Sequence, residues 1–272
     1  MKKYFALSLI VLTVFASMAS AEIMVGRHSM LNFTEKELVA LMQESLHREF
    51  YVGLDVASIA IKYYDSILNM QMALDRGDIE LMTLPLCVGQ FVLNSNPKYV
   101  IKGVDWWFIS SACTFNCAFL EKNKDLQKRF NEAITGMKNN GALAAIENKY
   151  VNELDVNNIA PVEFEKFDGA ETITVAVTGD MPPIDYVAAD GTPAGYNTAL
   201  LAEIGKRLHV NIKLVNVDTG ARVSALTSGR ADVVFWFQSN MDSSIPAIDV
   251  PSGIILSEPY YQWNEQYFIG KK

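Results

Sequence analysis

The chain has 272 residues, of which 50% are hydrophobic and 20% are charged, and its formal net charge is −8. This composition is ordinary for a globular protein and excludes wholesale disorder, and the length suits one two-lobed domain or two small ones. A negative net charge argues against binding to nucleic acid or to an anionic membrane surface. The histidines, His28, His47 and His209, are far apart, and the close His and Cys spacing of a zinc site is missing. We therefore expect no metal and no cofactor.

The N-terminus carries the pattern of an export signal. Lys2 and Lys3 precede an apolar run over residues 4–15, which is followed by Ala19-Ser20-Ala21. A basic start, an apolar run too short to span a bilayer and a small-residue cleavage site are typical of a secretory signal peptide. We expect a signal peptide over residues 1–21, cleavage before Glu22, and a periplasmic or secreted protein.

Residues 22–151 show both helical and extended patterns. Residues 23–25 form a short apolar run, and Thr34 with Glu37 makes a capping box that opens a helix. Apolar periodicity predicts further helices at residues 66–74, 125–137 and 142–151. Short apolar runs predict strands at residues 51–54, 79–84 and 98–101, and a longer aromatic run covers residues 106–117.

Three cysteines stand in this first half. Export permits disulfides. Cys113 and Cys117 lie four positions apart, and Cys87 lies in an apolar run. A Cys113–Cys117 bridge requires a turn between them, because the ends of an extended five-residue stretch are too far apart. The alternative is that the cysteines are buried, unreactive thiols.

The second half alternates strands and helices. Residues 152–171 contain Asn, Pro, Asp and Gly with little periodicity, and we interpret them as a linker. Beyond the linker, the pattern predicts strands and helices in turn at residues 173–177, 199–208, 212–217, 222–228 and from 231 onward. Such alternation indicates a parallel α/β sheet, whose ligands lie beyond the carboxyl ends of the strands. Residues 180–186 and 235–240 are then candidates for the mouth of a site.

Several motifs resemble one protein family. The segments ITVAVTGDMPPIDYV, GTPAGYNTALLAEIGKRL, ALTSGRADVV and LSEPYY are similar to the first lobe of the bacterial extracellular solute-binding proteins of the polar amino acid type. The segments YYDSILNMQMALDRGDIELM and FLEKNKDLQKRFNEAITGMKNNGALAAIENKYV are similar to their second lobe, whereas residues 22–63 match poorly. The resemblance implies an α/β fold of the type II periplasmic-binding-protein kind with two α/β lobes. We therefore expect a lobe over residues 22–151, a linker over residues 152–171 and a lobe over residues 172–272.

The lobes stand in reversed order relative to that family. Three arrangements remain open: a circular permutant that folds as one complete receptor, a truncated or divergent tandem of two incomplete domains, and partners that exchange lobes between chains. The expected assembly is accordingly a monomer or a lobe-swapped dimer.

The resemblance also implies a small-molecule site between the lobes. The family's stacking aromatic falls at Tyr186, its carboxylate-binding arginine position is occupied by Ser244, and its ammonium-binding aspartate position is occupied by Pro85. Burying a zwitterion without those partners is costly, so a plain amino acid ligand is disfavoured. The remaining candidates are aromatic and neutral polar residues, which suit a stacked and hydrogen-bonded ligand: Tyr186, Tyr196, Asn197, Trp236, Phe237, Gln238, Ser239 and Asn240. The alternative is that the aromatic residues belong to the core, because neighbouring residues of a strand face opposite sides.

The expected function is that of a non-catalytic exported binding protein. It would capture a small polar or aromatic, amino acid-like solute for an ABC-type transporter or a sensor. A periplasmic enzyme of the cyclohexadienyl dehydratase type is an alternative on the same fold. The sequence lacks a nucleophile elbow, a close His/Cys pair and a phosphate loop. A degenerate lobe pair used for protein contact is the third alternative, and the missing charged contacts favour it.

Overall fold

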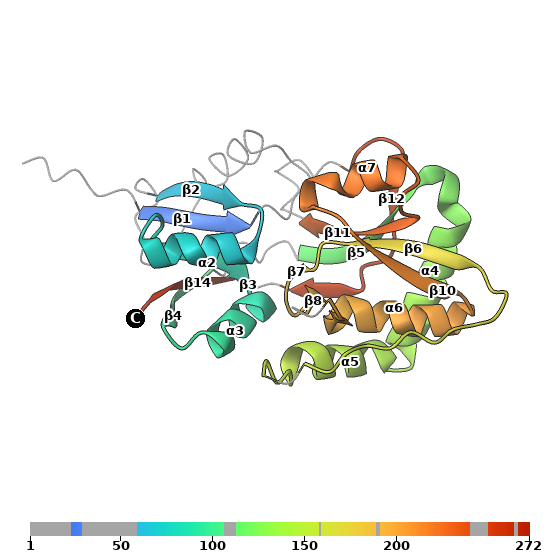
Figure 1. Ribbon diagram of the computed structural model, residues 1–272, viewed down its shortest axis with the longest axis horizontal. Coiled ribbons are helices and arrows are strands. Elements are labelled where there is room, and N and C mark those ends of the chain that lie inside the picture. The colour runs from blue at the N-terminus through green and yellow to red at the C-terminus, as the bar shows by residue number, and fades with distance from the viewer. Residues whose placement is uncertain are drawn as a thin grey trace, which may run out of the picture.

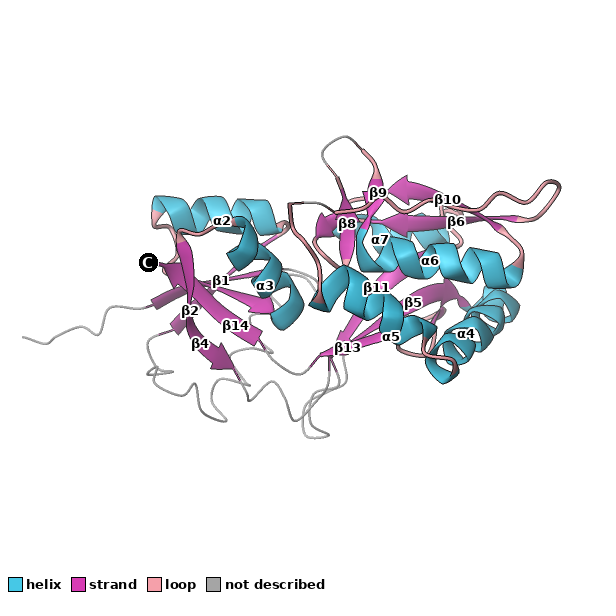
Figure 2. Ribbon diagram, turned by 90° about the horizontal axis from the view of Figure 1, so that it is seen from below, coloured by secondary structure: helices cyan, strands magenta, loops and turns pink. Residues whose placement is uncertain are grey.

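The protein forms two α/β lobes, each built on its own β-sheet (Figures 1 and 2). This computed structural model describes residues 23–28, 59–105, 113–157, 159–188, 191–239, 250–263 and 266–272. The expected signal peptide, the capping box at Thr34 and Glu37, the strand at 51–54 and Asn240 lie outside the described residues. The predicted α/β class with two lobes is confirmed.

The first lobe holds a five-stranded sheet in the order β2-β1-β3-β14-β4. Its strands are β1 (Ile23–His28), β2 (Ile59–Tyr64), β3 (Leu81–Pro85), β4 (Tyr99–Asp105) and β14 (Gln266–Lys271). β1 runs parallel to β2 and β3, whereas β14 is antiparallel to β3 and β4. The helices of this lobe are α2 (Ile67–Arg76) and α3 (Leu86–Ser95). α2 begins after Ser66, whose Oγ accepts a hydrogen bond from the Asn69 N–H at 3.2 Å.

The second lobe holds a sheet in the order β10-β6-β11-β5-β12, with β13 also paired to β5. Its strands are β5 (Cys113–Leu120), β6 (Thr172–Val177), β10 (Asn211–Asn216), β11 (Val233–Ser239), β12 (Ile254–Leu256) and β13 (Tyr261–Trp263). A small separate sheet contains β7 (Asp180–Met181), β8 (Asp185–Val187) and β9 (Pro193–Ala194). The helices are α4 (Lys124–Asn139), α5 (Ala142–Glu147) with the π-helical turn η4 (Asn148–Asn152), α6 (Gly195–Leu208) and α7 (Arg222–Thr227).

Each sheet contains one antiparallel strand from a distant part of the chain. β14 lies between β3 and β4 of the first lobe, and β5 lies between β11 and β12 of the second. In Figure 1 the dark red β14 accordingly stands among the blue and teal elements of the first lobe. The chain therefore crosses between the lobes twice, once between β4 and β5 and once between β13 and β14.

The boundaries between the lobes in the structure differ from the expected ones at 151 and 172. β5 and α4, expected in the lobe over residues 22–151, pack with the second lobe, and β14, expected in the lobe over residues 172–272, completes the first. The physical reason is strand pairing over long sequence distances, which local periodicity does not report. Among the described residues, 153–171 contain no helix or strand.

A cluster of aromatic side chains lies in the second lobe where β5 pairs with β13. The rings of Phe115 and Trp263 lie 4.9 Å apart between centroids, and those of Tyr196 and Tyr261 lie 5.2 Å apart. The Tyr196 hydroxyl donates a hydrogen bond to the Tyr260 carbonyl at 2.8 Å. All five residues are buried. This aromatic cluster joins α6 to β5 and β13.

Of the two alternatives for the cysteines, a Cys113–Cys117 bridge is excluded. β5 is extended from Cys113 to Leu120, so four residues span about 13 Å, well beyond the reach of a disulfide. Cys87 and Cys117 are free and buried, and burial raises their thiol pKa values to about 11 and about 12. For these two residues the alternative of unreactive thiols holds.

No helix in the part of the chain that the structure describes is both long and apolar enough to cross a membrane.

A first prediction concerns the inserted strand β14. Ile269 is fully buried, whereas its cross-strand partner Ile101 on β4 is 40% exposed. We expect Ile269→Ala to lower the free energy of unfolding by about 2–4 kcal/mol, because it leaves a cavity where β14 packs against α3. Ile101→Ala is the matched control and should cost about 1 kcal/mol or less. Urea denaturation measures both, and equal losses would contradict the buried position of β14.

Candidate functional site: a pocket between the lobes

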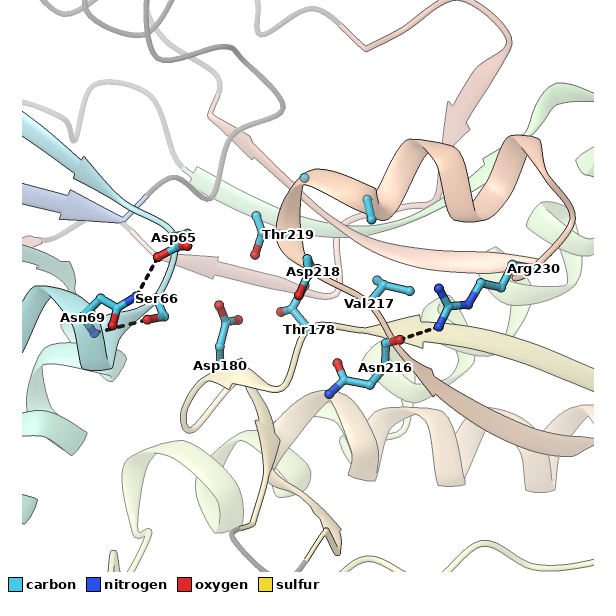
Figure 3. A pocket seen from close by; sticks show the side chains of 12 residues that line it. Asp65, Ser66, Asn69, Thr178, Asp180, Asn216, Val217, Asp218, Thr219 and Arg230 are labelled. Atoms are coloured by element: carbon cyan, nitrogen blue, oxygen red, sulfur yellow. Dashed lines mark hydrogen bonds between the residues drawn. The ribbon is translucent and has the colours of Figure 1, made fainter.

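A pocket of about 800 Å³ lies between the two lobes (Figure 3). The first lobe contributes residues before and within the first turn of α2. The second lobe contributes residues at or after the ends of β6 and β10, and Arg230, which follows α7. The lining residues are Asp65, Ser66, Asn69, Thr178, Asp180, Asn216, Val217, Asp218, Thr219, Gly220, Ala221 and Arg230. This volume suits a small organic solute.

The pocket stands where parallel strands end. Asp65 follows directly after β2, Thr178 follows β6, and Val217 follows β10. Ligands of open α/β sheets lie beyond the carboxyl ends of the strands, and here both lobes present such ends to one space. The expected mouth at residues 180–186 is thus partly correct, because Asp180 lines the pocket.

Hydrogen bonds fix several pocket side chains. The Asn69 amide donates to Asp65 Oδ1 at 2.9 Å, and the Arg230 guanidinium donates to the Asn216 carbonyl at 3.0 Å. In Figure 3 Asp65 and Arg230 lie at opposite ends of the pocket, with Asp180 between them. The pocket is therefore polar along its length and differs from the aromatic site that the sequence predicted.

A buried carboxylate supports the wall of the pocket. Asp185 is 4% exposed, and its Oδ2 accepts hydrogen bonds from the N–H and hydroxyl of Thr178 at 2.9 and 3.0 Å. Burial, with a smaller contribution from the neighbouring charge of Asp180, raises the pKa of Asp185 to about 6, although the hydrogen bonds from Thr178 act in the opposite direction. Asp185 thus ties the end of β6 to the β7–β8 ribbon.

A buried arginine lies behind the same wall. Arg222 is 7% exposed, its Nε donates to the Thr219 carbonyl at 3.0 Å, and its guanidinium stands 5.7 Å from the ring centroid of Trp236. Burial lowers the pKa of Arg222 to about 10, whereas Asp180 and Asp185 favour its charged form. Its charge therefore faces the acidic side of the second lobe.

Tyr186 lies at the contact between the lobes. It is half-buried on β8, and its ring centroid is 6.0 Å from that of Phe91 on α3 of the first lobe. Tyr186 is outside the set of residues that line the pocket. Its predicted stacking on a ligand stays a prediction, and its observed partner is Phe91.

Tyr196, Asn197 and Trp236 are buried side chains of the second lobe. Each is at most 1% exposed and lies within the second lobe, away from the lining of the pocket. Gly195 has φ 84°, and a Cβ there would meet the Pro183 carbonyl oxygen at 2.5 Å, so the first turn of α6 lies tightly against the preceding loop. Trp236 is on β11, a central strand covered on both faces. Tyr196 and Trp236 therefore pack as core aromatic residues, and the predicted role of all three residues in ligand binding stays a prediction.

The other predicted site residues lie on or beyond β11. Phe237, Gln238 and Ser239 pair through their backbones with residues 113–115 of β5, and Asn240 falls outside the described residues. Their predicted role in ligand binding stays a prediction.

Most of the pocket-lining residues are not among those that the sequence predicts as site residues. Asp65, Ser66 and Asn69 follow β2, a strand that the local pattern does not predict. Asn216 ends β10, a strand that the pattern predicts, and Asp218 follows it. The carboxyl end of β10 is the feature of the sequence that could have indicated the pocket. In the described part of the chain, no group of three or more His, Cys, Asp or Glu residues could hold a metal ion.

Comparison with known proteins finds one family-model match, which lies in the second half of the chain. Residues 173–271 match the family model of bacterial extracellular solute-binding proteins, family 3. These residues include the motifs that resemble the family's first lobe, so the predicted resemblance is confirmed. No curated protein sequence matches this chain.

Solved structures of binding proteins show a distant likeness. The ligand-binding component of an ABC-type import system from Staphylococcus aureus has a TM-score of 0.43 at 8% identity, over 92% of this chain and 65% of that chain. The alkanesulfonate-binding protein SsuA from Xanthomonas axonopodis pv. citri has a TM-score of 0.43 at 10% identity, over 93% and 66%. The substrate-binding domain of a putative molybdenum ABC transporter from Clostridium difficile has a TM-score of 0.45 at 12% identity, over 93% and 86%. This chain spans less than two thirds of the length of the first two proteins.

The buried Asp185 gives a pH-dependent prediction. Its pKa of about 6 in the folded state stands above its ordinary value of 3.8, so the folded state keeps a proton that the unfolded state releases as pH rises. The free energy of unfolding should therefore fall between pH 4 and pH 6, by up to about 3 kcal/mol from this group. Asp185→Asn should remove that part of the pH dependence while retaining an oxygen acceptor for the Thr178 N–H.

Urea unfolding between pH 4 and pH 7 measures this effect. Asp168 is exposed in the segment between η4 and β6. Asp168→Asn removes the same charge and should leave the wild-type pH dependence in place. An Asp185→Asn curve that runs parallel to the wild-type curve would contradict the assignment.

Proposed function

We propose that this protein is an exported two-lobed receptor that holds a small solute in the interlobe pocket and passes it to an ABC-type transporter or a sensor. The pocket carries the proposal, because it is lined from both lobes and its volume of about 800 Å³ suits a small molecule. The family match over residues 173–271 supports the same role.

We further infer that the reversed lobe order is a circular permutation within one chain. The motifs of the family's first lobe stand in the second half of this sequence, and residues 153–171 connect η4 to β6. β5 and β14 complete both sheets from within one chain. A pair of truncated domains would leave each sheet without its inserted strand, and a lobe-swapped dimer is unnecessary to supply it. This supports a monomer.

A binding role without catalysis accounts for the pocket chemistry. The hydroxyl, amide and carboxylate side chains that line the pocket can form hydrogen bonds to a solute held between the two lobes. A degenerate lobe pair used only for protein contact does not require a pocket of this size.

Ligand stabilisation tests the proposed function. Residues 22–272 would be unfolded in guanidinium and refolded to remove bound solute, then screened by thermal shift with anionic, neutral and cationic solutes. We expect one class to raise the Tm by several degrees, because a ligand that binds only the folded state stabilises it.

A pocket-filling variant provides the control. Gly220 lines the pocket, and a Cβ placed there meets nothing within 4 Å. Gly220→Phe should keep the Tm of the unliganded protein and lose the solute-induced rise. The proposal fails if no solute class raises the Tm, or if the variant responds as the wild type does.

A further inference from the structure

α3 joins the two lobes through a buried contact. Its Cys87 thiol shares a hydrogen bond with the Tyr261 hydroxyl on β13, and the centroid of its Phe91 ring lies 6.0 Å from that of Tyr186 on β8. Cys87 is 3% exposed and Tyr261 is 7% exposed. In Figures 1 and 2 α3 extends toward the second lobe. A helix of the first lobe thus reaches two elements of the second.

α3 also packs closely on its own lobe. A Cβ at Gly89 would meet the Tyr267 ring at 2.9 Å and Ile269 Cδ1 at 3.3 Å, and both of those residues are on β14. β13 and β14 are the strands on either side of one chain crossing between the lobes. α3 therefore contacts the strand before this crossing through Cys87 and the strand after it through Gly89.

The contact at α3 belongs to a continuous hydrophobic core. One cluster of buried residues includes Cys87 and Val88 of α3 together with Tyr196 and Tyr261 of the second lobe. Separating the lobes here would expose apolar surface to water, which is unfavourable in proportion to the area exposed. Glu147 of α5 faces the same contact, but it is only half-buried, so its carboxylate keeps access to water. We therefore expect the lobes to stay in contact at α3.

The pocket side of the space between the lobes is polar and open to water. Asp65 and Asn69 of the first lobe and Asp218 and Gly220 of the second line the pocket, and all four are exposed. Water can replace contacts between such groups, so widening the pocket costs little free energy. The space between the lobes thus has one side that resists separation and another that permits it.

We propose that α3 is the pivot of the lobe motion. The contacts of α3 with β8 and β13 persist while the pocket widens and narrows between the start of α2 and the start of α7. Such a rotation is a hinge motion, in which a few residues near the pivot absorb the change in backbone angles. This inference rests on the proposed function, because a receptor has to open its pocket to admit a solute.

Double electron–electron resonance on the refolded, solute-free protein compares the two sides. In a Cys113→Ser background, one spin-label pair replaces Leu68 on α2 and Thr227 on α7 across the pocket, and the other replaces Gln90 on α3 and Ala144 on α5 across the pivot. The four labelled positions are exposed. We expect the pocket pair to give a distance distribution at least about twice as wide as that of the pivot pair, because a hinge motion is largest away from its axis. Equal widths would overturn the proposal.

The native thiols give a second measurement. Cys87 lies at the pivot and Cys117 lies in the core of the second lobe, and burial raises their pKa values to about 11 and about 12. Labelling of Cys113→Ser with N-ethylmaleimide, read by peptide mass spectrometry, follows both thiols in the same molecule. We expect Cys87 to react at a rate within about tenfold of that of Cys117, because both become accessible only on global unfolding. A Cys87 rate more than about a hundredfold higher would mean that the lobes separate at α3 and would overturn the proposal.

A truncation at the pivot provides a matched pair of variants. Phe91→Ala removes the ring that meets Tyr186 and lies outside the pocket lining, so it should widen the pivot distribution and speed the labelling of Cys87 relative to Cys117. Met72→Ala is the control, because Met72 is an apolar residue of α2 that is 48% exposed, and it should change neither result.

The outcomes separate this inference from the proposed function. Both measurements use solute-free protein, so separation at α3 overturns the pivot and leaves any solute-induced rise in Tm intact. If the pocket pair is wide and the pivot pair narrow but no solute raises the Tm, the lobes move as proposed and the receptor role fails.

Discussion

The structure depends on two strands, β5 and β14, each of which completes the sheet of one lobe from a distant part of the chain. β5 comes from the first half of the chain but lies inside the sheet of the second lobe. β14 comes from the end of the chain but lies inside the sheet of the first lobe. Without β14, β3 and β4 would lose their shared partner, and without β5 the second sheet would separate into two parts. The chain passes between the lobes just before β5 and just before β14, and these two connections also link the lobes. The inserted strands therefore complete both sheets, and the connections hold the walls of the pocket opposite each other.

The pocket follows from this arrangement. β2, β6 and β10 end toward the space between the lobes, and their following residues carry the polar side chains that line it. The buried Asp185 fixes one wall through Thr178, and the capped start of α2 fixes the other through Ser66. The pocket is therefore formed at the carboxyl ends of β2, β6 and β10 and at the start of α2, which the fold places around one space.

Much of the fold could be predicted from local sequence pattern. The periodicity at residues 66–74 and 125–137 corresponds to α2 and α4, and the apolar run at 173–177 corresponds to β6. α3 was missed because its residues are apolar around the helix and give little periodicity. The placement of β5 and β14 was missed because pairing partners far apart in sequence leave no local pattern.

The site was harder to predict than the fold. The aromatic character of Tyr196 and Trp236 suggests contacts to a stacked ligand, yet both side chains are buried within the second lobe. Asp65 and Asp218 are unremarkable in sequence, because each is a single acid in a loop. They become a candidate site only when two lobes bring them to one pocket.

Small-angle scattering with size exclusion on residues 22–272, with and without a solute that raises the Tm, tests the central claim most directly. The account predicts a monomer at both stages and a smaller radius of gyration with the solute, because the lobes close on the occupied pocket. A dimer, or a monomer whose radius of gyration is unchanged when the solute is bound, would contradict it.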